Sequence, residues 1–377
     1  MSATTTKKTI DEAVDERTYA SYARPLLWRL VATREFAVVA LLLLVFFYSR
    51  ANIVGFDGPL TLYFLFLQSA PIMLLALPMT LVIITGEIDL SVASTMALTG
   101  AILGIAYTKW DLPFVLSMVL AIGVGLACGL FNGFLVSYVK LPSIAVTIGT
   151  LALYRGLAQG FLGTEAINGF PEKWTDLTKE RISDGSSYPL VLIPFVVLAI
   201  AFGLLLHFSS FGRGVYEIGL NDEAARFTGV DIARTKLILF ALAGAVAGLA
   251  GVYQTLYSGV ARGDASQNLE LQVIAAVLLG GVSIFGGRGT LPGVVAGVLL
   301  IAVINSAMRL DGIRTEVTDI IIGCLLVASV LAPMLLTWVS GLAPGRVRRT
   351  ASRSSTPTEP SVTGGPSLDS KSANERQ

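Results

Sequence analysis

Acidic and hydroxyl side chains interrupt a long apolar stretch at residues 85–94, which read TGEIDLSVAS. Glu87, Asp89 and Ser91 can do chemistry here, because carboxylates and a hydroxyl group can hydrogen-bond a polar solute or hold an opposite charge. A backbone break at membrane depth is tolerated only where protein or water satisfies the freed polar groups. Two interpretations stay open: a polar pathway or gate through an apolar layer, or a tight turn whose carboxylates are solvated.

Arg155 is a second candidate, because it lies near the middle of the apolar run at residues 143–162. An unpaired charge at that depth costs at least roughly 2.5 to 3.5 kcal/mol on insertion scales, so the guanidinium group must face protein or water. Glu270 and Asp319 are possible partners for a structural or gating ion pair. The alternative is an arginine that reaches out of its span to the interface.

Uncharged polar side chains also occur within apolar runs, at Gln68, Gln254, Gln272 and Asn305. Such groups can replace water around a neutral solute, although interhelical hydrogen bonding is their commoner use. Asn305 is retained as a candidate for the pathway or gate.

No metal site and no cofactor site are predicted from the sequence. His207 is the single histidine, and it lies at the end of an apolar run, where we interpret it as an interface residue. Cys128 and Cys324 lie in separate apolar runs without metal-ligand spacing, which favours packing roles for both.

A short capped helix is predicted in the segment NDEAARFTGV, residues 221–230. Asn221 is a suitable N-cap, and Asp222 and Glu223 fall in the first turn, where the helix dipole favours negative charge. The segment belongs to a polar loop, residues 209–235, between two apolar runs. A helix in this position offers a surface to a partner.

These residues are positioned by apolar segments long enough to cross a membrane. Of the 377 residues, 54% are hydrophobic and 14% are charged, and the mean hydropathy is +0.72, far above that of a water-soluble domain. A membrane-spanning helix needs about 20 apolar residues. We therefore predict an all-α integral membrane protein, a polytopic bundle of about ten transmembrane helices. The expected spans are Glu35–Tyr48, Leu60–Ile84, Val92–Tyr107, Leu112–Tyr138, Ser143–Leu162, Leu190–Phe208, Lys236–Ser258, Leu269–Phe285, Leu291–Met308 and Val317–Val339.

The basic residues orient this bundle, because cytoplasmic segments keep positive charge during insertion. With the N-terminus inside, eighteen of the 27 Lys and Arg residues fall in inner segments and eight in outer ones. Both termini are therefore expected to be cytoplasmic. The expected parts are a cytoplasmic segment 1–34, a transmembrane domain 35–340 with an extracytoplasmic loop 163–189 and a cytoplasmic loop 209–235, and a disordered cytoplasmic tail 341–377.

A second break in an apolar stretch occurs at residues 280–293, which read GGVSIFGGRGTLPG. Glycines there permit close helix approach or unusual backbone dihedrals. Both breaks are expected on the cytoplasmic side, whereas mates in an inverted repeat would lie on opposite faces. No internal repeat is therefore inferred from them.

Four segments, in chain order, resemble the permeases of bacterial ATP-binding-cassette (ABC) importers for monosaccharides: TLVIITGEIDLSVAS, LPSIAVTIGTLALYRGLAQG, NDEAARFTGVDIARTK and AAVLLGGVSIFGGRGTLPGVVAG. This group includes the ribose, xylose, rhamnose and autoinducer-2 systems, and the resemblance covers residues 35 to 340. Most members resemble GGIDLSVGS at the first motif, so Glu87 and Ala93 replace glycines in this chain.

The resemblance implies an import machine in the bacterial cytoplasmic membrane. Two permease subunits, alike or different, would form the pathway, two ATPase subunits would lie beneath them, and an extracytoplasmic sugar-binding protein would deliver a monosaccharide. By the same resemblance, NDEAARFTGV is similar to the coupling helix that docks in a cleft of the ATPase. Its contact residues would be Asn221, Asp222, Glu223, Ala224, Ala225, Arg226 and Gly229.

ATP hydrolysis is expected on another chain, because no lysine here follows a glycine and a P-loop of the GxxxxGK[ST] kind is impossible. The chain is therefore expected to be a transport subunit and not an enzyme. The net charge of +1 gives no reason to expect a nucleic-acid partner, and the expected surroundings are membrane lipid. Segments such as LGTEAINGFPEKWTDL look closest to the rhamnose and autoinducer-2 branch, with rhamnose favoured. The alternative is a self-sufficient secondary sugar transporter driven by an ion gradient, although carriers of that kind usually place paired carboxylates at mid-membrane.

Overall fold

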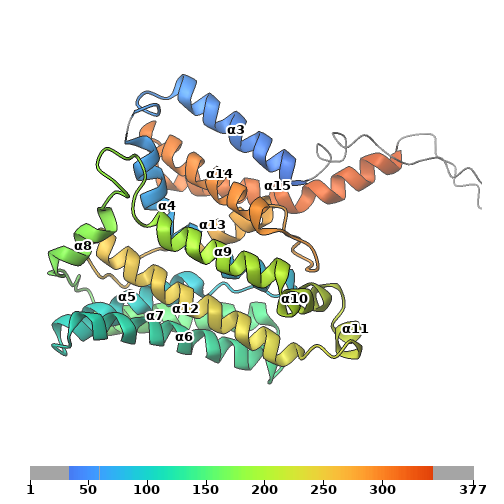
Figure 1. Cartoon of the computed structure of the whole chain (residues 1–377), viewed down its shortest axis with the longest axis horizontal. Helices are drawn as coiled ribbons and strands as arrows, with labels where there is room; N and C mark the ends of the chain where they lie inside the picture. Colours follow the sequence, from blue (N-terminus) through green and yellow to red (C-terminus); the bar gives the residue numbers. More distant parts are fainter. Residues whose placement is uncertain (1–33, 59, 343–377) are drawn as a thin grey trace, which may run out of the picture. The chain divides into compact units, whose positions relative to one another are not determined.

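The computed structural model describes residues 34–58 and 60–342, and these are almost entirely helical (Figure 1). The helices are α3 (Arg34–Asn52), α4 (Thr61–Ile84), α5 (Val92–Thr108), α6 (Phe114–Ser137), α7 (Ser143–Leu162), α8 (Glu172–Lys179), α9 (Leu192–Phe208), α10 (Ser210–Leu220), α11 (Asp222–Phe227), α12 (Ile232–Ser258), α13 (Leu269–Leu279), α14 (Leu291–Leu310) and α15 (Thr315–Leu342).

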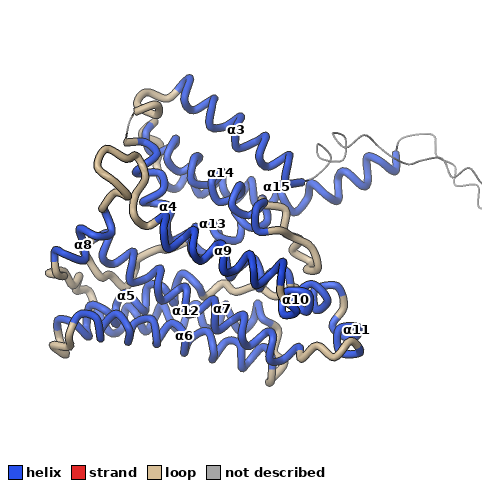
Figure 2. Tube along the Cα trace, viewed as in Figure 1, coloured by secondary structure: helices blue, strands red, loops and turns tan. Residues whose placement is uncertain are grey.

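Loops and isolated bridges join these helices, and Figure 2 shows no strand in the part of the chain that it colours. The all-α prediction is confirmed. The chain divides into two compact units, Met1–Met334 and Leu335–Gln377. The arrangement described below is that of the first unit. The expected segments 1–34 and 341–377 lie almost wholly outside the described residues.

Four described helices are long and apolar enough to cross a membrane by length and composition, namely α4, α6, α12 and α14. The bent pair α9 and α10 would add a fifth, with an angle of 69° between its two parts. The residues 36–52 of α3, together with α5 and α13, are apolar but shorter. The chain is thus a polytopic helical membrane protein, and the count of ten spans stays a prediction.

The helices differ from the expected segments at three places. The expected eighth span, Leu269–Phe285, ends as helix α13 at Leu279, since the glycine-rich segment begins directly afterwards with Gly281 at φ +93°. The expected loop 209–235 contains a second helix, α10, whose N-cap Ser209 accepts a hydrogen bond from the backbone N–H of Gly212. The expected loop 163–189 contains helix α8.

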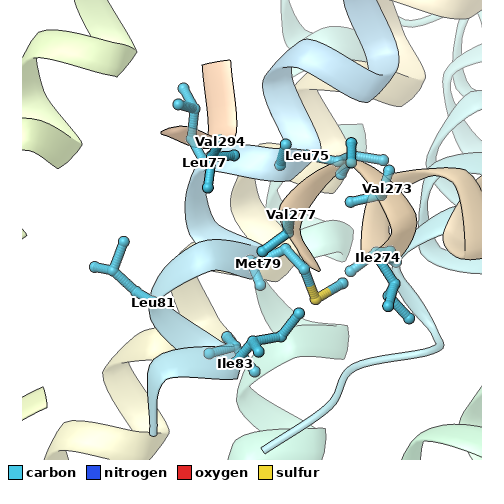
Figure 3. Close-up of a cluster of buried hydrophobic side chains, with 14 of the residues drawn as sticks. Leu75, Leu77, Met79, Leu81, Ile83, Val273, Ile274, Val277 and Val294 are labelled. Carbon is cyan, nitrogen blue, oxygen red and sulfur yellow. The ribbon is translucent and has the colours of Figure 1, made fainter. Parts of the chain in front are cut away.

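Helix α4 forms the centre of the main core, because nearly all of its side chains from Ser69 onward are buried. It is apolar all round, as expected for a helix surrounded by protein. Figure 3 shows Met79 of α4 beside Val277 and Ile274 of α13, with Val294 of α14 near Leu77. Helices α4, α13 and α14 therefore form one packed group.

A second group is formed by α5, α6, α7 and α12. Helix α12 packs along α6, where Gly125 and Gly129 of α6 face Gly244 and Gly248 of α12. A Cβ atom at Gly129 would overlap the carbonyl oxygen of Phe240, so only glycine permits this backbone approach, as in small-xxx-small helix pairs. In Figure 1, α8 lies at the left end of these helices and α10 and α11 lie at the right end.

Candidate functional site

The predicted capped helix exists as α11, and it lies at the end of the molecule that α10 also occupies (Figure 1). The Asn221 side chain accepts a hydrogen bond from the backbone N–H of Ala224 at 2.9 Å, which confirms its N-cap role. Gly229 follows the helix with φ +86°, a conformation that side chains rarely adopt. The chain sequence thus fixes both ends of this short helix.

The two faces of α11 differ in exposure. Ala225 is 1% exposed and packs with Ile218 of α10 and Ile232 of α12, so its methyl group attaches the helix to its own chain. Asp222, Glu223, Ala224 and Arg226 are exposed. The outward face is therefore acidic at its start and basic at its end, and the predicted contact of Ala225 with a partner stays untested.

Phe227 projects from the last residue of α11 and is 92% exposed. The sequence interpretation did not select it. The sequence did contain an indication, because an aromatic residue ends a short helix that is otherwise charged or small. Ala225 is the residue of this helix that packs inward, so Phe227 faces outward. A ring this exposed is available to a partner, and aromatic residues, phenylalanine among them, are enriched at protein interfaces.

The first break, residues 85–91, joins α4 to α5 and is satisfied by protein groups. Gly86 turns the chain at φ +81°. The backbone N–H of Ile88 donates to Ser143 Oγ at 3.2 Å, and Thr147 Oγ1 donates to the carbonyl oxygen of Ile88 at 3.2 Å. The start of α7 therefore supplies the partners that a broken backbone requires.

Asp89 and Ser91 belong to a buried hydrogen-bond network. Asp89 Oδ1 accepts from the backbone N–H of Ser91 at 2.9 Å and from its hydroxyl group at 2.6 Å. The Asn132 amide of α6 donates to Ser91 Oγ at 2.8 Å, and the Tyr154 hydroxyl of α7 donates to Asn132 Oδ1 at 3.1 Å. Burial raises the pKa of the Asp89 carboxyl, and the two bonds from Ser91 oppose that effect. The network ties the break to two further helices.

The two breaks that the sequence separates by almost 200 residues meet in space, and α10 joins them. The backbone N–H of Gly287 donates to the carbonyl oxygen of Ile84 at 2.8 Å. A Cβ atom at Gly219 of α10 would overlap both of these groups. Residues 84–87, 286–287 and 219 form a junction between the breaks and α10, which we call the glycine junction.

Glu87 forms an ion pair with Lys236, a residue that the sequence interpretation did not select, and a role of Glu87 in a pathway or gate stays a prediction. Lys236 lies near the start of α12, and its Nζ is 2.7 Å from Glu87 Oε1 and 3.2 Å from Asp222 Oδ2. The side chains of Lys236 and Glu87 are 10% and 16% exposed, whereas that of Asp222 is 47% exposed. One ammonium group thus connects the first break with α11.

Arg155 does not form the expected ion pair. Its Nη1 donates to the backbone carbonyl oxygen of Ala265 at 2.5 Å, in the segment between α12 and α13. Glu270 and Asp264 act on the guanidinium group electrostatically, but none of the ion pairs formed by the described residues includes Arg155. The Asp319 carboxylate instead accepts hydrogen bonds from Asn268 and Gln272. Arg155 therefore ties α7 to the segment following α12.

Asn305 takes part in a chain of hydrogen bonds across three helices. Its amide donates to Gln272 Oε1 of α13 at 3.1 Å, and Gln272 Nε2 donates to Asp319 Oδ1 of α15 at 3.3 Å. Asn268 also donates to Asp319, at 3.4 Å. This is interhelical bonding, the commoner use of such residues, and a pathway role for Asn305 stays a prediction.

A cavity of about 390 Å³ lies at the end opposite to α11, between the link from α3 to α4 and the last turn of α14. Apolar walls from Leu60, Phe64 and Leu310 surround polar groups of Gln68 and Arg309. The predicted pathway or gate residues do not line it. It is separate from the ion pairs and the glycine junction.

Both a family model and individual protein relatives match the chain. The model for the family described as branched-chain amino acid transport system / permease component matches residues 61–330. The autoinducer 2 import system permease protein LsrD of Photorhabdus temperata is 33% identical over 264 residues, 68% of this chain and 78% of the relative. The protein of the same name from Enterobacter sp. (strain 638) is 36% identical over 268 residues, 70% of this chain and 81% of the relative. No solved structure matches the chain.

Proposed function

Since the chain belongs to the family of branched-chain amino acid transport system permease components, we propose that it imports a small hydroxylated solute and that α11 docks on the ATPase that drives import. The chain is the multi-pass membrane permease subunit of a bacterial ABC importer, and it is not an enzyme. Its family implies an ATPase subunit and a solute-binding protein as partners. Our proposal concerns the identity of the solute and the residues that couple transport to ATP hydrolysis.

The outward face of α11 is the observation that supports the coupling role. A capped helix of six residues exposes Glu223, Arg226 and the 92% exposed ring of Phe227. Such a combination of charges around an aromatic residue is typical of a protein interface, in which buried aromatic and arginine anchors contribute most of the binding free energy. The attachment of α11 to the glycine junction through α10 gives this surface a route into the membrane helices.

Orientation agrees with this role. The positive-inside asymmetry predicts that α10 and α11 lie on the cytoplasmic side, where an ATPase subunit has access to ATP. Ten spans with both termini inside also belong to the proposal. A second permease subunit, either a copy of this chain or a related one, completes the pathway.

The solute is proposed to be a neutral polyhydroxylated molecule of monosaccharide size. The relatives reported above are named for autoinducer 2 and not for rhamnose, so autoinducer 2 replaces rhamnose as the favoured solute. Rhamnose and ribose remain to be tested beside it. A self-sufficient carrier driven by an ion gradient is the alternative from another class, and it predicts uptake without ATP.

The decisive experiment is purification of the full chain from its native membrane in mild detergent, followed by mass spectrometry of what co-purifies. We expect an ATPase subunit with a P-loop, a permease partner and a solute-binding protein. Reconstituted vesicles are then tested with autoinducer 2, L-rhamnose and D-ribose, with and without ATP inside. A chain that purifies alone and transports one of these solutes without ATP would establish the carrier instead.

Replacement of the two exposed charges tests the role of α11 directly. The double variant Glu223→Ala, Arg226→Ala should insert normally, because both side chains are exposed and α11 is held by Ala225. Uptake of the solute should be abolished, since the coupling surface is lost. Normal ATP-driven uptake by this variant would remove α11 from the mechanism.

A further inference from the structure

The Lys236 ammonium group lies where three elements of the permease meet. Lys236 belongs to α12, Glu87 to the break between α4 and α5, and Asp222 to the first turn of α11. Its two contacts measure 2.7 Å to Glu87 Oε1 and 3.2 Å to Asp222 Oδ2. These three side chains are called the charge relay below.

The two bonds of the charge relay differ in strength. The contact with Glu87 is shorter, and both of its side chains are largely buried, so water screens it little. The contact with Asp222 is longer, and Asp222 is about half exposed, so solvent weakens it. The ammonium group is therefore held firmly by Glu87 and more loosely by α11.

Glu87, the more tightly bound partner of Lys236, is connected through its neighbours to the membrane helices. Glu87 is followed by Ile88, whose backbone is bonded to Ser143 and Thr147 of α7, and then by Asp89 with its buried network. Movement of Glu87 therefore acts on the beginnings of α5 and α7 together. Rigid, hydrogen-bonded segments of this kind can transmit a displacement between sites.

The more exposed contact, that of Asp222, lies on α11, a helix of only six residues. Besides Asp222, α11 is attached to its own chain through the buried methyl group of Ala225 and through the adjoining Thr228, whose hydroxyl donates to Glu217 Oε2 at 2.8 Å. A partner that displaces α11 would change the Asp222 contact first. The ammonium group would then redistribute its bonding between the two carboxylates.

We propose that the charge relay transmits displacement of α11 to the break between α4 and α5, and that Glu87 and Lys236 thereby set how much solute is imported for each ATP hydrolysed. This inference rests on the proposed function of α11. Glu87 and Lys236 are positioning residues in this role, since neither needs to touch the solute.

The test compares single and paired neutral substitutions in the full complex. Lys236→Met alone strands the buried Glu87 carboxylate, which is costly, so a lower yield of inserted protein is expected. The double variant Glu87→Gln, Lys236→Met removes both charges and should insert and retain its ATPase subunit as the unaltered chain does. Its yield separates a role in transmission from a role in folding.

The readout is the ratio of solute imported to ATP hydrolysed in reconstituted vesicles, with autoinducer 2, L-rhamnose and D-ribose as probes. We expect this ratio to fall at least about fivefold in the double variant, within the range of typical coupling between sites, while the ATPase subunit stays bound. The exposed pair Lys109 and Glu165, at 2.9 Å, provides the matched control. Lys109→Met, Glu165→Gln should leave the ratio unchanged.

A double variant that inserts, binds its ATPase and keeps the unaltered ratio would overturn the charge relay as a transmission device while leaving the proposed function intact. An unaltered complex without ATP-dependent uptake would instead overturn the proposed function, and this inference with it. An equal fall in the control variant would also count against the charge relay.

Discussion

At the scale of single residues, Gly219 is the most constrained glycine in the region of α10 and α11. Its backbone touches the last turn of α4 and the second break, both through main-chain atoms. Main-chain atoms cannot rotate away as a flexible side chain can, so an added methyl group must displace α10 or one of the breaks. The glycine junction depends on the absence of a side chain here.

Gly219→Ala should therefore destabilise the protein. Overpacking of this kind typically costs about 1 to 3 kcal/mol, and we expect a lower midpoint in thermal unfolding of the purified protein in detergent. Gly203→Ala in α9 is the matched control, because nothing lies within 4 Å of the position of its Cβ atom. Equal midpoints for the two variants would contradict the close contact at the glycine junction.

Residue types in the sequence identified Glu87, Asp89, Ser91, Arg155 and Asn305 as noteworthy but not their partners. Asp89 and Ser91 bind each other and Asn132, and Arg155 binds a backbone carbonyl group instead of a carboxylate. These partners lie on helices distant in sequence, and helix periodicity alone does not fix which faces meet. Lys236 was missed for the same reason, because the sequence marked it only as the first residue of an expected span.

At the scale of elements, α11 combines a buried attachment with an exposed aromatic end. Phe227 is 92% exposed, and the other exposed apolar side chain of its helix is only the small methyl group of Ala224. Its ring gains free energy only when a partner covers it, and full burial of a phenylalanine side chain is worth about 1.5 to 3 kcal/mol.

Phe227→Ala should weaken binding of the ATPase subunit by roughly tenfold or more, because 1.4 kcal/mol corresponds to one factor of ten. The measurement is the amount of ATPase that co-purifies with the tagged permease as detergent washes are extended. Leu220→Ala provides the control, since this 68% exposed side chain belongs to α10 and not to α11. Equal retention by both variants would show that the phenyl ring is not an anchor.

The lengths of the apolar runs predicted most of the helices, and the N-cap residue Asn221 predicted α11. Helix α10 escaped prediction because its glycines resemble a loop, although Ser209 caps it and Val215 and Ile218 form its buried face. Helix α13 is shorter than its apolar run, since the glycine-rich segment replaces the expected last turns. The cap and buried face thus determine α10, and the glycine that follows Gly280 ends α13.

At the scale of the whole molecule, the path of α7 across the membrane decides on which side α11 lies. Helix α7 carries Arg155 and is absent from the helices that qualify as spans by length and composition. Yet its N-terminal end bonds the first break, beside α10, and Arg155 bonds the segment after α12. From this geometry and the distribution of basic residues we predict that α7 crosses the membrane from inside to outside.

Cysteine labelling tests that crossing directly. In a background with Cys128→Ala and Cys324→Ala, one chain carries Val139→Cys, before α7, and another carries Asp176→Cys, in α8. Both positions are exposed. A membrane-impermeant maleimide should label position 176 in intact cells and position 139 only after permeabilisation, because positive charge holds the inner segments in the cytoplasm. The cysteine-free parent should stay unlabelled throughout. Labelling of both positions in intact cells would mean that α7 does not cross, and the reverse pattern would place α11 outside, where no ATPase could bind it.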